Sequence, residues 1–571
     1  MSGESPARGV EPSTSDAVSA AALAWIAQDP DPETRAELET LVERASAGDE
    51  AALADLRSRF DERLAFGTAG LRGEIAAGPA RMNRVLVAQA AAGIARYLLE
   101  KRGGGASVVI GYDGRKNSRV FAQDSAEVFA GAGVRTILLP RLLPTPVLAF
   151  AVRHLGVSAG VMVTASHNPA KDNGYKVYLG DDDHGSQIVP PTDADIAAHI
   201  AAVAAAGPIT ALPRSEAYEL ADEALVYAYV AATAAVAGPL PADTGLDVVY
   251  TAMHGVGWDT ASRVFEAAGL PAPLSVAAQQ EPDPAFPTVS FPNPEEPGAL
   301  DLAMAAARES GAELIIANDP DADRFAAAVP DAAAEGGWRR LTGNEVGTLL
   351  GWSAAEDEAA GAHGAHHAPR QLSASIVSSP ALRAVAEHFA LGYTDTLTGF
   401  KWISRTPDLL FGYEEALGYL VNPETVRDKD GISAAARFVS LALRWKAAGR
   451  TVADQLELVG AAIGHFASGQ IALRVTDLSE RGRIMGRLRA TPPAALGDDA
   501  VTSFEDLAEA TGPGALRDDI LRIRTAAGSR VMIRPSGTEP KLKVYLDSRG
   551  ATTVEADARV AALEAAVRAL L

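Results

Sequence analysis

Short apolar runs rich in β-branched residues alternate along the chain with Ala- and Leu-rich stretches, and this alternation predicts an α/β protein. Four of the runs lead directly into polar loops that contain Gly or several Asp residues. These predicted strands are Ser107–Ile110, Gly160–Val163, Glu313–Ala317 and Leu409–Phe411. Ligands of open α/β sheets bind beyond the carboxyl ends of strands. The four loops are therefore candidate parts of one site.

Helical patterns stand out in two further stretches. Residues Ser19–Leu64 are helical in pattern and strongly acidic, and the uncharged, Ala-rich stretch Ala224–Ala242 predicts a helix that ends at Gly238. Prolines near the end of that stretch argue against a membrane span. Residues 1–16 are rich in Ser, Pro, Gly and Glu, and this composition predicts disorder.

Composition narrows the classes of function. At 571 residues the chain exceeds the roughly 250–300 residues of a single core, so several domains are expected. Its 51 basic and 73 acidic residues give a net charge of −22, so neither nucleic acid nor an anionic membrane is an expected partner. A small anionic substrate would need a local basic pocket. The absence of cysteine excludes disulfides, thiolate nucleophiles and zinc–sulfur sites.

Two segments bear on location and on metals. The N-terminal stretch lacks the basic and apolar regions of a signal peptide, so a cytoplasmic location is expected. A histidine-rich tract with His363, His366 and His367 has no carboxylate at a fixed helical offset, and we interpret it as a solvated loop. The number of subunits is left open by these features.

The sharpest chemical signal is the segment DPDADR at residues 319–324. Three carboxylates at alternate positions after an apolar strand can converge on one hard cation. A calcium EF-hand is excluded because its sixth and twelfth positions hold Arg324 and Pro330 instead of Gly and Glu. An acidic helix cap is the plainer alternative. Three protein oxygens leave room for a phosphate oxygen on the same cation, as magnesium usually binds.

Two further segments suggest phosphate chemistry. In TASHNP (164–169) the Ser166 hydroxyl has an imidazole beside it and lysines soon after, and a serine needs such activation to act as a nucleophile. In RPSGTEP (534–540) an arginine, two hydroxyls and a glycine can form an anion cradle. Each segment alone equally suits an ordinary turn. No Walker-type GxxxxGK[ST] motif occurs, so a kinase would lack its nucleotide site. Together the segments suggest phosphoryl transfer on a phosphorylated substrate.

In their order along the chain, four loops resemble those of the α-D-phosphohexomutase superfamily, which includes phosphoglucomutases, phosphomannomutases and phosphopentomutases. TASHNP resembles the phosphoserine loop, DPDADR the metal loop, GYEEALGY (412–419) the sugar-binding loop and RPSGTEPK (534–541) the phosphate-binding loop. Three more segments point to the branch of longer phosphoglucomutase/phosphopentomutase enzymes: FGTAGLRG (66–73), TGFKW (398–402) and RDKDG (427–431).

The resemblance implies an α/β fold of four domains around a central cleft. The first three would be similar mixed α/β sheet domains, and the fourth a smaller α+β domain. The expected segments are a disordered N-terminus (1–16), domain 1 with the phosphoserine loop (17–240), domain 2 with the metal loop (241–337), domain 3 with the sugar-binding loop (338–460) and domain 4 with the phosphate-binding loop (461–571).

The resemblance also implies an intramolecular phosphotransferase that uses one Mg²⁺ per chain and a sugar 1,6-bisphosphate as activator. Phosphorylated Ser166 would give its phosphoryl group to a sugar monophosphate, and the bisphosphate would turn around and return its other phosphate. The expected catalytic residues are Ser166, His167, Lys176, Arg72, Arg324 and Lys429; the expected metal ligands are Ser166, Asp319, Asp321 and Asp323; the expected substrate-binding residues are Lys401, Glu414, Arg534, Ser536, Gly537 and Thr538. The choice of general acid/base among Lys176, His167 and Lys429 stays open.

One departure concerns the substrate. Family sugar loops commonly read Gly-Glu-x-Ser-Gly, and here Ala416 stands where the serine hydroxyl would contact the sugar. The resemblance implies interconversion of the 1- and 6-phosphates of glucose, mannose or both. Loss of one polar contact can shift selectivity, which makes a pentose 1-/5-phosphate an alternative. A more distant alternative is a non-catalytic sugar-phosphate-binding protein, which would be expected to lack Ser166 or a metal-loop aspartate.

Overall fold

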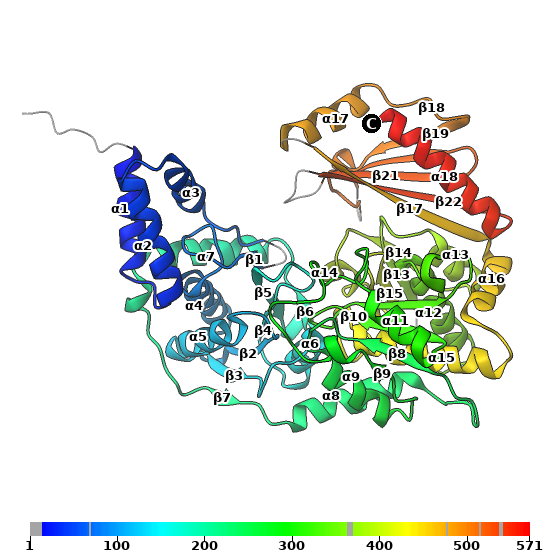
Figure 1. The fold of residues 1–571 in the computed structure, drawn as a ribbon, viewed down its shortest axis with the longest axis horizontal. Coiled ribbons are helices and arrows are strands. Elements are labelled where there is room, and N and C mark those ends of the chain that lie inside the picture. The colour runs from blue at the N-terminus through cyan, green and yellow to red at the C-terminus, as the bar shows by residue number, and fades with distance from the viewer. Residues whose placement is uncertain (1–13, 68–69, 363–368, 476–477, 513–514, 536–540) are drawn as a thin grey trace, which may run out of the picture. The chain divides into compact units, whose positions relative to one another are not determined.

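The computed structural model describes residues 14–67, 70–362, 369–475, 478–512, 515–535 and 541–571. These residues form two compact units (Figure 1). Unit 1 runs to Tyr227 and adds Met253–Val256 and Glu281–Asn293, whereas unit 2 comprises Ala228–Ala252, Gly257–Gln280 and Pro294–Leu571. Three predictions lie wholly or largely outside the described residues: the disorder expected for residues 1–16, of which only Thr14–Asp16 are described, the histidine tract, and the roles of Ser536, Gly537 and Thr538. Residues Thr14–Asp16 form the first turn of a helix, so the prediction of disorder was wrong for these three residues.

The acidic helical stretch of unit 1 forms three helices, α1 (Thr14–Ile26), α2 (Pro32–Ser46) and α3 (Glu50–Phe60). Aspartates immediately before α2 and α3 accept hydrogen bonds from backbone N–H groups of each first turn, which otherwise lack partners. Local sequence therefore sets where both helices begin.

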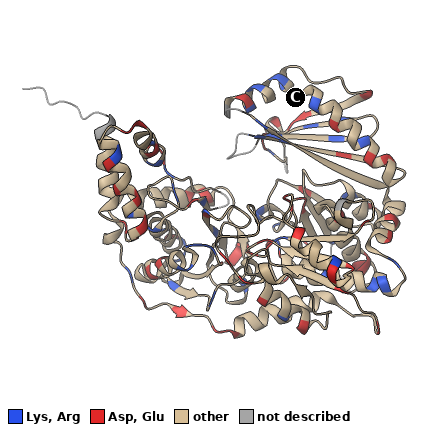
Figure 2. Ribbon diagram, viewed as in Figure 1, with Lys and Arg blue, Asp and Glu red and all other residues tan. Residues whose placement is uncertain are grey.

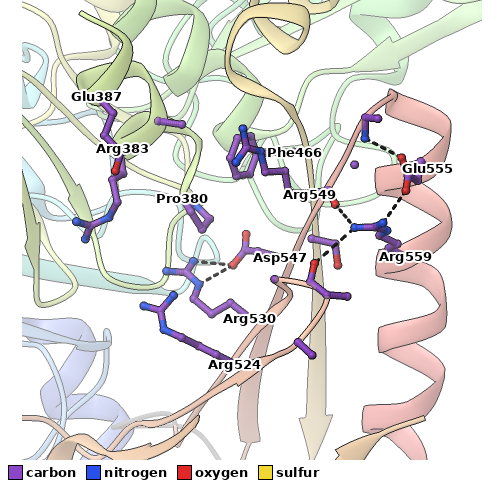
Figure 3. Close-up of a pocket in the computed structure, with 17 residues that line it drawn as sticks. Pro380, Arg383, Glu387, Phe466, Arg524, Arg530, Asp547, Arg549, Glu555 and Arg559 are labelled. Carbon is purple, nitrogen blue, oxygen red and sulfur yellow. Dashed lines mark hydrogen bonds and ion pairs between the residues drawn. The ribbon is translucent and has the colours of Figure 1, made fainter. Parts of the chain in front are cut away.

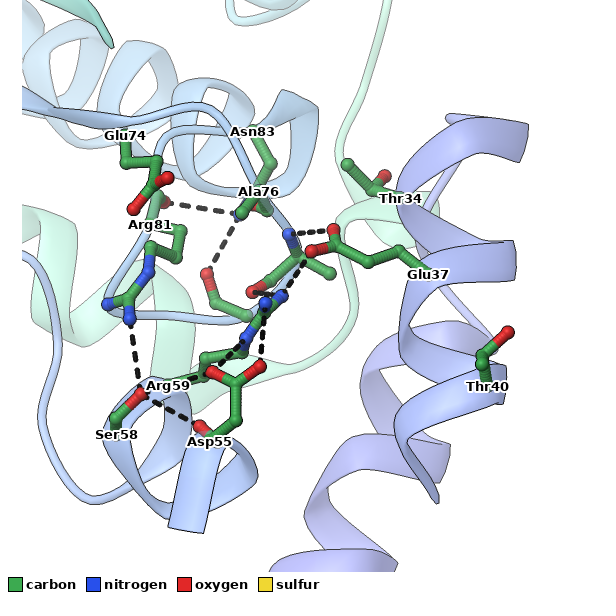
Figure 4. Close-up of polar contacts among 12 residues, drawn as sticks. Thr34, Glu37, Thr40, Asp55, Ser58, Arg59, Glu74, Ala76, Arg81 and Asn83 are labelled. Carbon is green, nitrogen blue, oxygen red and sulfur yellow. Dashed lines mark hydrogen bonds and ion pairs between the residues drawn. The ribbon is translucent and has the colours of Figure 1, made fainter. Parts of the chain in front are cut away.

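Helices α2 and α3 are tied to the chain that follows strand β1 (Leu71–Glu74). Arg59 of α3 donates to Asp55 at 2.9 Å and to Glu37 of α2 at 2.7 Å, and Glu37 also accepts the N–H of Ala77 at 3.0 Å (Figure 4). Arg59 is buried. This partly buried ion-pair network ties helices α2 and α3 to the segment that follows the strand carrying Arg72.

Unit 1 is built around one seven-stranded mixed sheet in the order β1-β5-β4-β2-β3-β7, with β6 paired to β5. Its centre is parallel, and β4–β5 and β1–β5 are antiparallel. Besides β1, the strands are β2 (Ser107–Tyr112), β3 (Arg135–Leu138), β4 (Ala159–Val163), β5 (Asp172–Leu179), β6 (Ser186–Gln187) and β7 (Glu219–Leu220). The helices are α4 (Arg84–Arg102), α5 (Ser118–Gly131), α6 (Thr145–His154) and α7 (Thr192–Ala206).

Unit 2 holds three sheets, in the orders β12-β11-β10-β8-β9, β14-β13-β15-β16 and β17-β22-β21-β20-β19-β18. The first contains β8 (Val248–Thr251), β9 (Leu274–Ser275), β10 (Leu314–Asn318), β11 (Phe325–Pro330) and β12 (Trp338–Arg340); the second β13 (Gln371–Ser375), β14 (Gly392–Thr396), β15 (Leu409–Glu414) and β16 (Gly418–Leu420); the third β17 (His465–Arg474), β18 (Ala495–Leu496), β19 (Asp499–Asp506), β20 (Leu521–Thr525), β21 (Arg530–Pro535) and β22 (Lys541–Gly550). The four strands predicted from sequence are confirmed as β2, β4, β10 and β15.

Helices cover these sheets. They are α9 (Gly257–Ala267), α10 (Ala277–Gln280), α11 (Asp301–Ser310), α12 (Gly343–Ala359), α13 (Ala381–His388), α14 (Phe400–Ile403), α15 (Gly431–Ala447), α16 (Val452–Ile463), α17 (Leu478–Ala490) and α18 (Thr553–Leu570). Helix α18 carries both acidic and basic residues (Figure 2), and in it Arg559 pairs with Glu555 and Arg568 with Glu564. In the C-terminal domain, apolar side chains of β20–β22 and α18 share one core.

The Ala-rich stretch forms α8 (Ala224–Ala234) and a 3₁₀ turn (Ala235–Ala237), and it ends at Gly238, whose φ of 62° is left-handed. The predicted end of this helix is confirmed. Glycine adopts such a φ without steric penalty. Within the described part of the chain, no helix combines the length and apolar character needed to cross a membrane.

Candidate active site

Ser166 occupies a strained turn between β4 and β5. Its φ is 53°, a left-handed conformation that is costly for a residue with a side chain, and only 2% of its surface is exposed. The Ser166 Oγ lies 3.2 Å from His167 Nδ1, and its N–H donates to Thr164 Oγ1 at 2.9 Å. The turn thus holds a hydroxyl and an imidazole within hydrogen-bond distance.

Arg115 fixes this turn through backbone carbonyls. Its guanidinium donates to the carbonyl oxygens of Asn168 at 2.6 Å, Pro169 at 2.9 Å and Asp172 at 3.2 Å, and also to that of Ser166. Arginine suits this task because its five N–H groups form a rigid, planar fork. The polar loop after β2 is a predicted part of the site, but its sequence alone assigns no role to Arg115.

A buried carboxylate orients Arg115. Asp113 lies 3.4 Å from the Arg115 Nε and accepts hydrogen bonds from Thr164 Oγ1 and Ser118 Oγ, both at 2.6 Å. Burial raises the pKa of Asp113, and the charge of Arg115 together with these hydrogen bonds acts in the opposite direction. One network therefore joins the ends of β2 and β4 and sets the Ser166 backbone.

We predict that Arg115→Lys lowers kcat by about 10- to 100-fold with a smaller change in KM, because a misplacement of about 1 Å can cost that much. A lysine has one charged point and cannot span four carbonyls. Steady-state kinetics with a sugar phosphate would measure the effect, and Arg119→Lys, at an exposed position on α5, is the control. An unchanged kcat would contradict a positioning role for Arg115.

Neighbouring strands place the other predicted residues of unit 1. Arg72 on β1 lies opposite Gly174 of β5, and Lys176 of β5 lies opposite Met162 of β4. Arg72 donates to the Asn168 side chain at 3.3 Å, whereas Lys176 is buried. Arg72 therefore contacts the Ser166 turn, and Lys176 lies on the strand that leaves it.

Unit 2 brings Asp319, Asp321 and Asp323 together between β10 and β11. All three are fully buried, and one carboxylate oxygen of each lies within 4.8 Å of the others. Burial raises the pKa of Asp319 well above its ordinary value, and the charges of Asp321 and Asp323 raise it further. Such crowded carboxylates are hard oxygen donors whose repulsion a divalent cation relieves. The donor set fits Mg²⁺.

The N-terminus of α15 braces this loop. A Cβ on Gly431 would lie 2.2 Å from the Arg324 carbonyl oxygen, so only glycine fits there. The Gly431 N–H donates to the Ala322 carbonyl at 3.2 Å, and Asp430 caps the helix by accepting from two of its N–H groups. The RDKDG segment is thus packed directly against the aspartate loop.

Lys429 lies beside the same buried aspartates. Its Nζ lies 2.9 Å from Asp323 and 3.7 Å from Asp428. Burial alone would lower the pKa of Lys429, but Asp323, Asp428 and Glu414 raise it above the ordinary value. These carboxylates therefore favour the protonated, cationic form of Lys429.

Arg324 connects the aspartate loop to the sugar loop. It donates to the carbonyl of Ala416 at 2.8 Å and lies 3.9 Å from Asp319. In the sugar loop, Glu415 accepts from Ser375 and Ser378, each at 3.0 Å. The side chain of Glu415 is therefore held in place by two serine hydroxyls.

Glu414 has a different electrostatic setting. Burial raises the pKa of Glu414 to about 6, and the charges of Lys429 and Arg324 partly oppose this. Lys401, at the start of α14, lies with its Nζ 6.0 Å from the centre of the Trp402 ring. Arg534 is the penultimate residue of β21, and its Nε lies 3.5 Å from Asp518. The substrate roles of these residues stay predictions.

Comparison with known proteins identifies the class. The chain matches the phosphoglucomutase/phosphomannomutase alpha/beta/alpha domains I, II and III over residues 63–206, 228–334 and 342–460, and the C-terminal domain of the same family over 477–567. The chain belongs to the phosphoglucomutase/phosphomannomutase family, and so to the α-D-phosphohexomutase superfamily. The expected four-domain α/β fold is confirmed.

Individual relatives agree with this. A "Probable phosphomannomutase" of Haemophilus influenzae is 52% identical over 492 residues, which cover 86% of this chain and 98% of that protein. A "Probable phosphoribomutase" of Schizosaccharomyces pombe is 36% identical over 561 residues, covering 92% and 93%. A crystal structure of a family protein from Burkholderia thailandensis, 19% identical, matches the fold with a TM-score of 0.68 over 89% of this chain and 97% of that one. The protein is a phosphosugar mutase, as predicted.

Proposed function

We propose that this mutase interconverts the 1- and 6-phosphates of a hexose, mannose or glucose, through phosphorylated Ser166 and a sugar bisphosphate. The observation that carries the choice of hexose is the 52% identity to the Haemophilus influenzae relative across nearly all of that protein. In the reaction, the Ser166 phosphoryl group passes to the free hydroxyl of the monophosphate. The other phosphate of the resulting bisphosphate then returns to the serine.

Each group of residues has a proposed task in this cycle. Asp319, Asp321 and Asp323 hold Mg²⁺, which when bound neutralises charge on the transferring phosphoryl group. Arg324 and Lys429 supply further positive charge beside these carboxylates. A bound bisphosphate acts as activator because it can leave its phosphate on Ser166.

The other predicted residues complete the proposal. Arg72, His167 and Lys176 stabilise the phosphoryl group on the serine side. Lys401 and Glu414 contact the sugar, and Arg534 holds the phosphate that does not react. Ser536, Gly537 and Thr538 are proposed to act with Arg534, on the motif alone. The general acid/base remains to be chosen among His167, Lys176 and Lys429; the raised pKa of Lys429 favours a cationic role for that residue.

A pentose phosphate is the second candidate substrate, and the sugar loop favours it. Position 416 offers a methyl group where family members commonly have a serine hydroxyl. The loop's backbone is fixed at this point by the hydrogen bond from Arg324 to the Ala416 carbonyl. A hydroxyl added there would project from an anchored backbone.

The deciding experiment measures kcat/KM for mannose-1-, glucose-1- and ribose-1-phosphate in parallel, with Mg²⁺ and a trace of the matching bisphosphate. We expect a hexose phosphate to lead, and Ala416→Ser to raise its kcat/KM by about fivefold, the effect of one net hydrogen bond of about 1 kcal/mol. The Ala416→Ser substitution does not change the neighbouring Glu415, which accepts hydrogen bonds from two serines. If ribose-1-phosphate leads, the enzyme is a phosphopentomutase.

A further inference from the structure

A buried ion pair joins two strands of the C-terminal sheet. Arg530 begins β21 and lies opposite Asp547 of β22, and two nitrogens of its guanidinium donate to one Asp547 carboxylate oxygen, at 3.0 and 2.6 Å (Figure 3). Ser468 of β17 donates to the other oxygen at 2.7 Å. Both charged side chains are buried, where a charge needs a partner. Asp547 is thus held from both neighbouring strands, and it fixes the direction of the guanidinium.

Arg530 also donates to the backbone of the segment that follows β13. One of its N–H groups donates to the carbonyl of Ile376 at 2.9 Å, and another donates to the carbonyl of Ser378. Apolar side chains of this segment and of the C-terminal domain form one buried cluster, namely Ile376, Val377, Leu507, Ile520, Met532 and Tyr545. Residues 376–378 are therefore bound to the C-terminal sheet by charge-assisted hydrogen bonds and by apolar packing.

The same segment holds the sugar loop. The Ser378 hydroxyl donates to the Glu415 carboxylate at 3.0 Å and accepts the Glu415 N–H, also at 3.0 Å. This N–H belongs to the peptide group that joins Glu414 to Glu415. Ser378 therefore fixes the backbone beside Glu414, the residue proposed to contact the sugar.

The ion pair shares one face of the sheet with Arg534. Side chains two residues apart lie on the same face of a strand, so Arg530, Met532 and Arg534 of β21 point the same way. Their partners on β22 are Asp547, Tyr545 and Lys543, in that order. Burial raises the pKa of Tyr545, and the charge of Glu415 raises it further, whereas that of Arg534 opposes this. Tyr545 thus lies within electrostatic reach of both the sugar loop and Arg534.

We propose that Arg530 is a positioning residue, which holds the sugar loop at a fixed place relative to Arg534 and so aligns the two ends of a bound sugar phosphate. The inference rests on the proposed function, in which Glu414 contacts the sugar and Arg534 holds the phosphate that does not react. Arginine suits this task because its planar fork pairs with a carboxylate and donates to two carbonyls at once.

Arg530→Lys in the full chain tests the inference, with the sugar phosphate that leads in the deciding experiment as substrate. Lysine keeps a charge for Asp547 but lacks the fork that reaches both carbonyls. We expect KM to rise about tenfold, the scale of a lost hydrogen bond from a charged group, with kcat within threefold of wild type. KM does not depend on the concentration of folded enzyme, so partial unfolding alone would leave it unchanged. Arg522→Lys, at an arginine of β20 that pairs with Glu505, is the matched control and should keep the wild-type KM.

A second substitution tests the route from Arg530 to the sugar loop. Ser378→Ala removes the hydroxyl that holds Glu415 and keeps the carbonyl that Arg530 contacts. In the Ser378→Ala background, Arg530→Lys should raise KM less than threefold, because residues that act through one another have non-additive effects. Two effects on KM that multiply, or a KM for Arg530→Lys within twofold of wild type, would overturn the inference.

Glu414→Gln separates this inference from the proposed function. It should lower kcat/KM at least tenfold, because a contact with a sugar hydroxyl is lost. Unchanged kinetics would refute the sugar contact and with it the role of Arg530. A loss for Glu414→Gln without a change in KM for Arg530→Lys would overturn the positioning role alone. A lead for ribose-1-phosphate would refute the proposed hexose and not the positioning role, because the leading substrate is the one used.

Discussion

Asp321→Asn is expected to lower catalytic efficiency by about 1,000-fold while making the metal-free protein more resistant to heat. The carboxylates of Asp319, Asp321 and Asp323 are fully buried and crowded within 4.8 Å. Like charges in such a site raise the free energy of the folded state, as the raised pKa of Asp319 indicates. An amide of the same shape removes one of these charges. The apparent Tm without metal should therefore rise by about 1–3 °C.

Activity should move in the opposite direction. If the three aspartates hold Mg²⁺, loss of one charged ligand removes cation binding and with it the stabilisation of the transferring phosphoryl group. We expect kcat/KM to fall by about 1,000-fold, in the range of a lost electrostatic contact in a buried site. Added Mg²⁺ should raise the Tm of the wild type by mass action and leave that of the variant unchanged.

Asp498→Asn, at an exposed position, is the control and should change neither quantity. The two measurements separate a metal site from an acidic cap. A cap would lose stability on substitution and would show no response to Mg²⁺. Equal Mg²⁺-induced shifts in variant and wild type, or activity within tenfold of wild type, would refute the proposed role of the triad.

Sequence alone gave a good account of the elements that carry the site. Apolar runs that end in Gly- or Asp-rich loops are local features, and the strands β2, β4, β10 and β15 all formed where such runs occur. The spacing of Asp319, Asp321 and Asp323 is local as well, and the loop brings their carboxylates together. These features can therefore be predicted from the sequence alone, because residues close together in the chain determine them.

The tertiary contacts of the site residues could not be predicted from the sequence. Arg115 was visible as part of a polar loop, but its bonds to the carbonyls after Ser166 depend on the pairing of β2 with β4. The sequence left Lys429 as a possible base, and only the approach of Asp323 shows why its pKa is raised. Nothing local distinguishes Glu414 from Glu415, whose hydrogen bonds come from serines at the end of β13 and beyond.

Ser166→Ala is expected to lower mutase kcat/KM by about 10⁴-fold or more, the scale of losing a nucleophile. The reason lies in the proposed covalent cycle, in which no other hydroxyl carries the phosphoryl group. Incubation with a sugar bisphosphate labelled in its phosphates should leave one acid-stable phosphoserine per chain in the wild type and none in the variant. Ser310→Ala, at an exposed position on α11, is the matched control and should label normally.

Ser166→Gly adds a test of the strained backbone. Ser166 has a φ of 53°, where a Cβ costs about 1–2 kcal/mol and glycine pays no such penalty. Both variants should be inactive, but the glycine variant should unfold at a higher temperature than the alanine variant. The two variants would then share the loss of activity but differ in thermal stability, because the strained backbone places the hydroxyl and does not stabilise the fold. Activity above one percent in either variant, or label retained in both, would show that the phosphoryl group resides elsewhere.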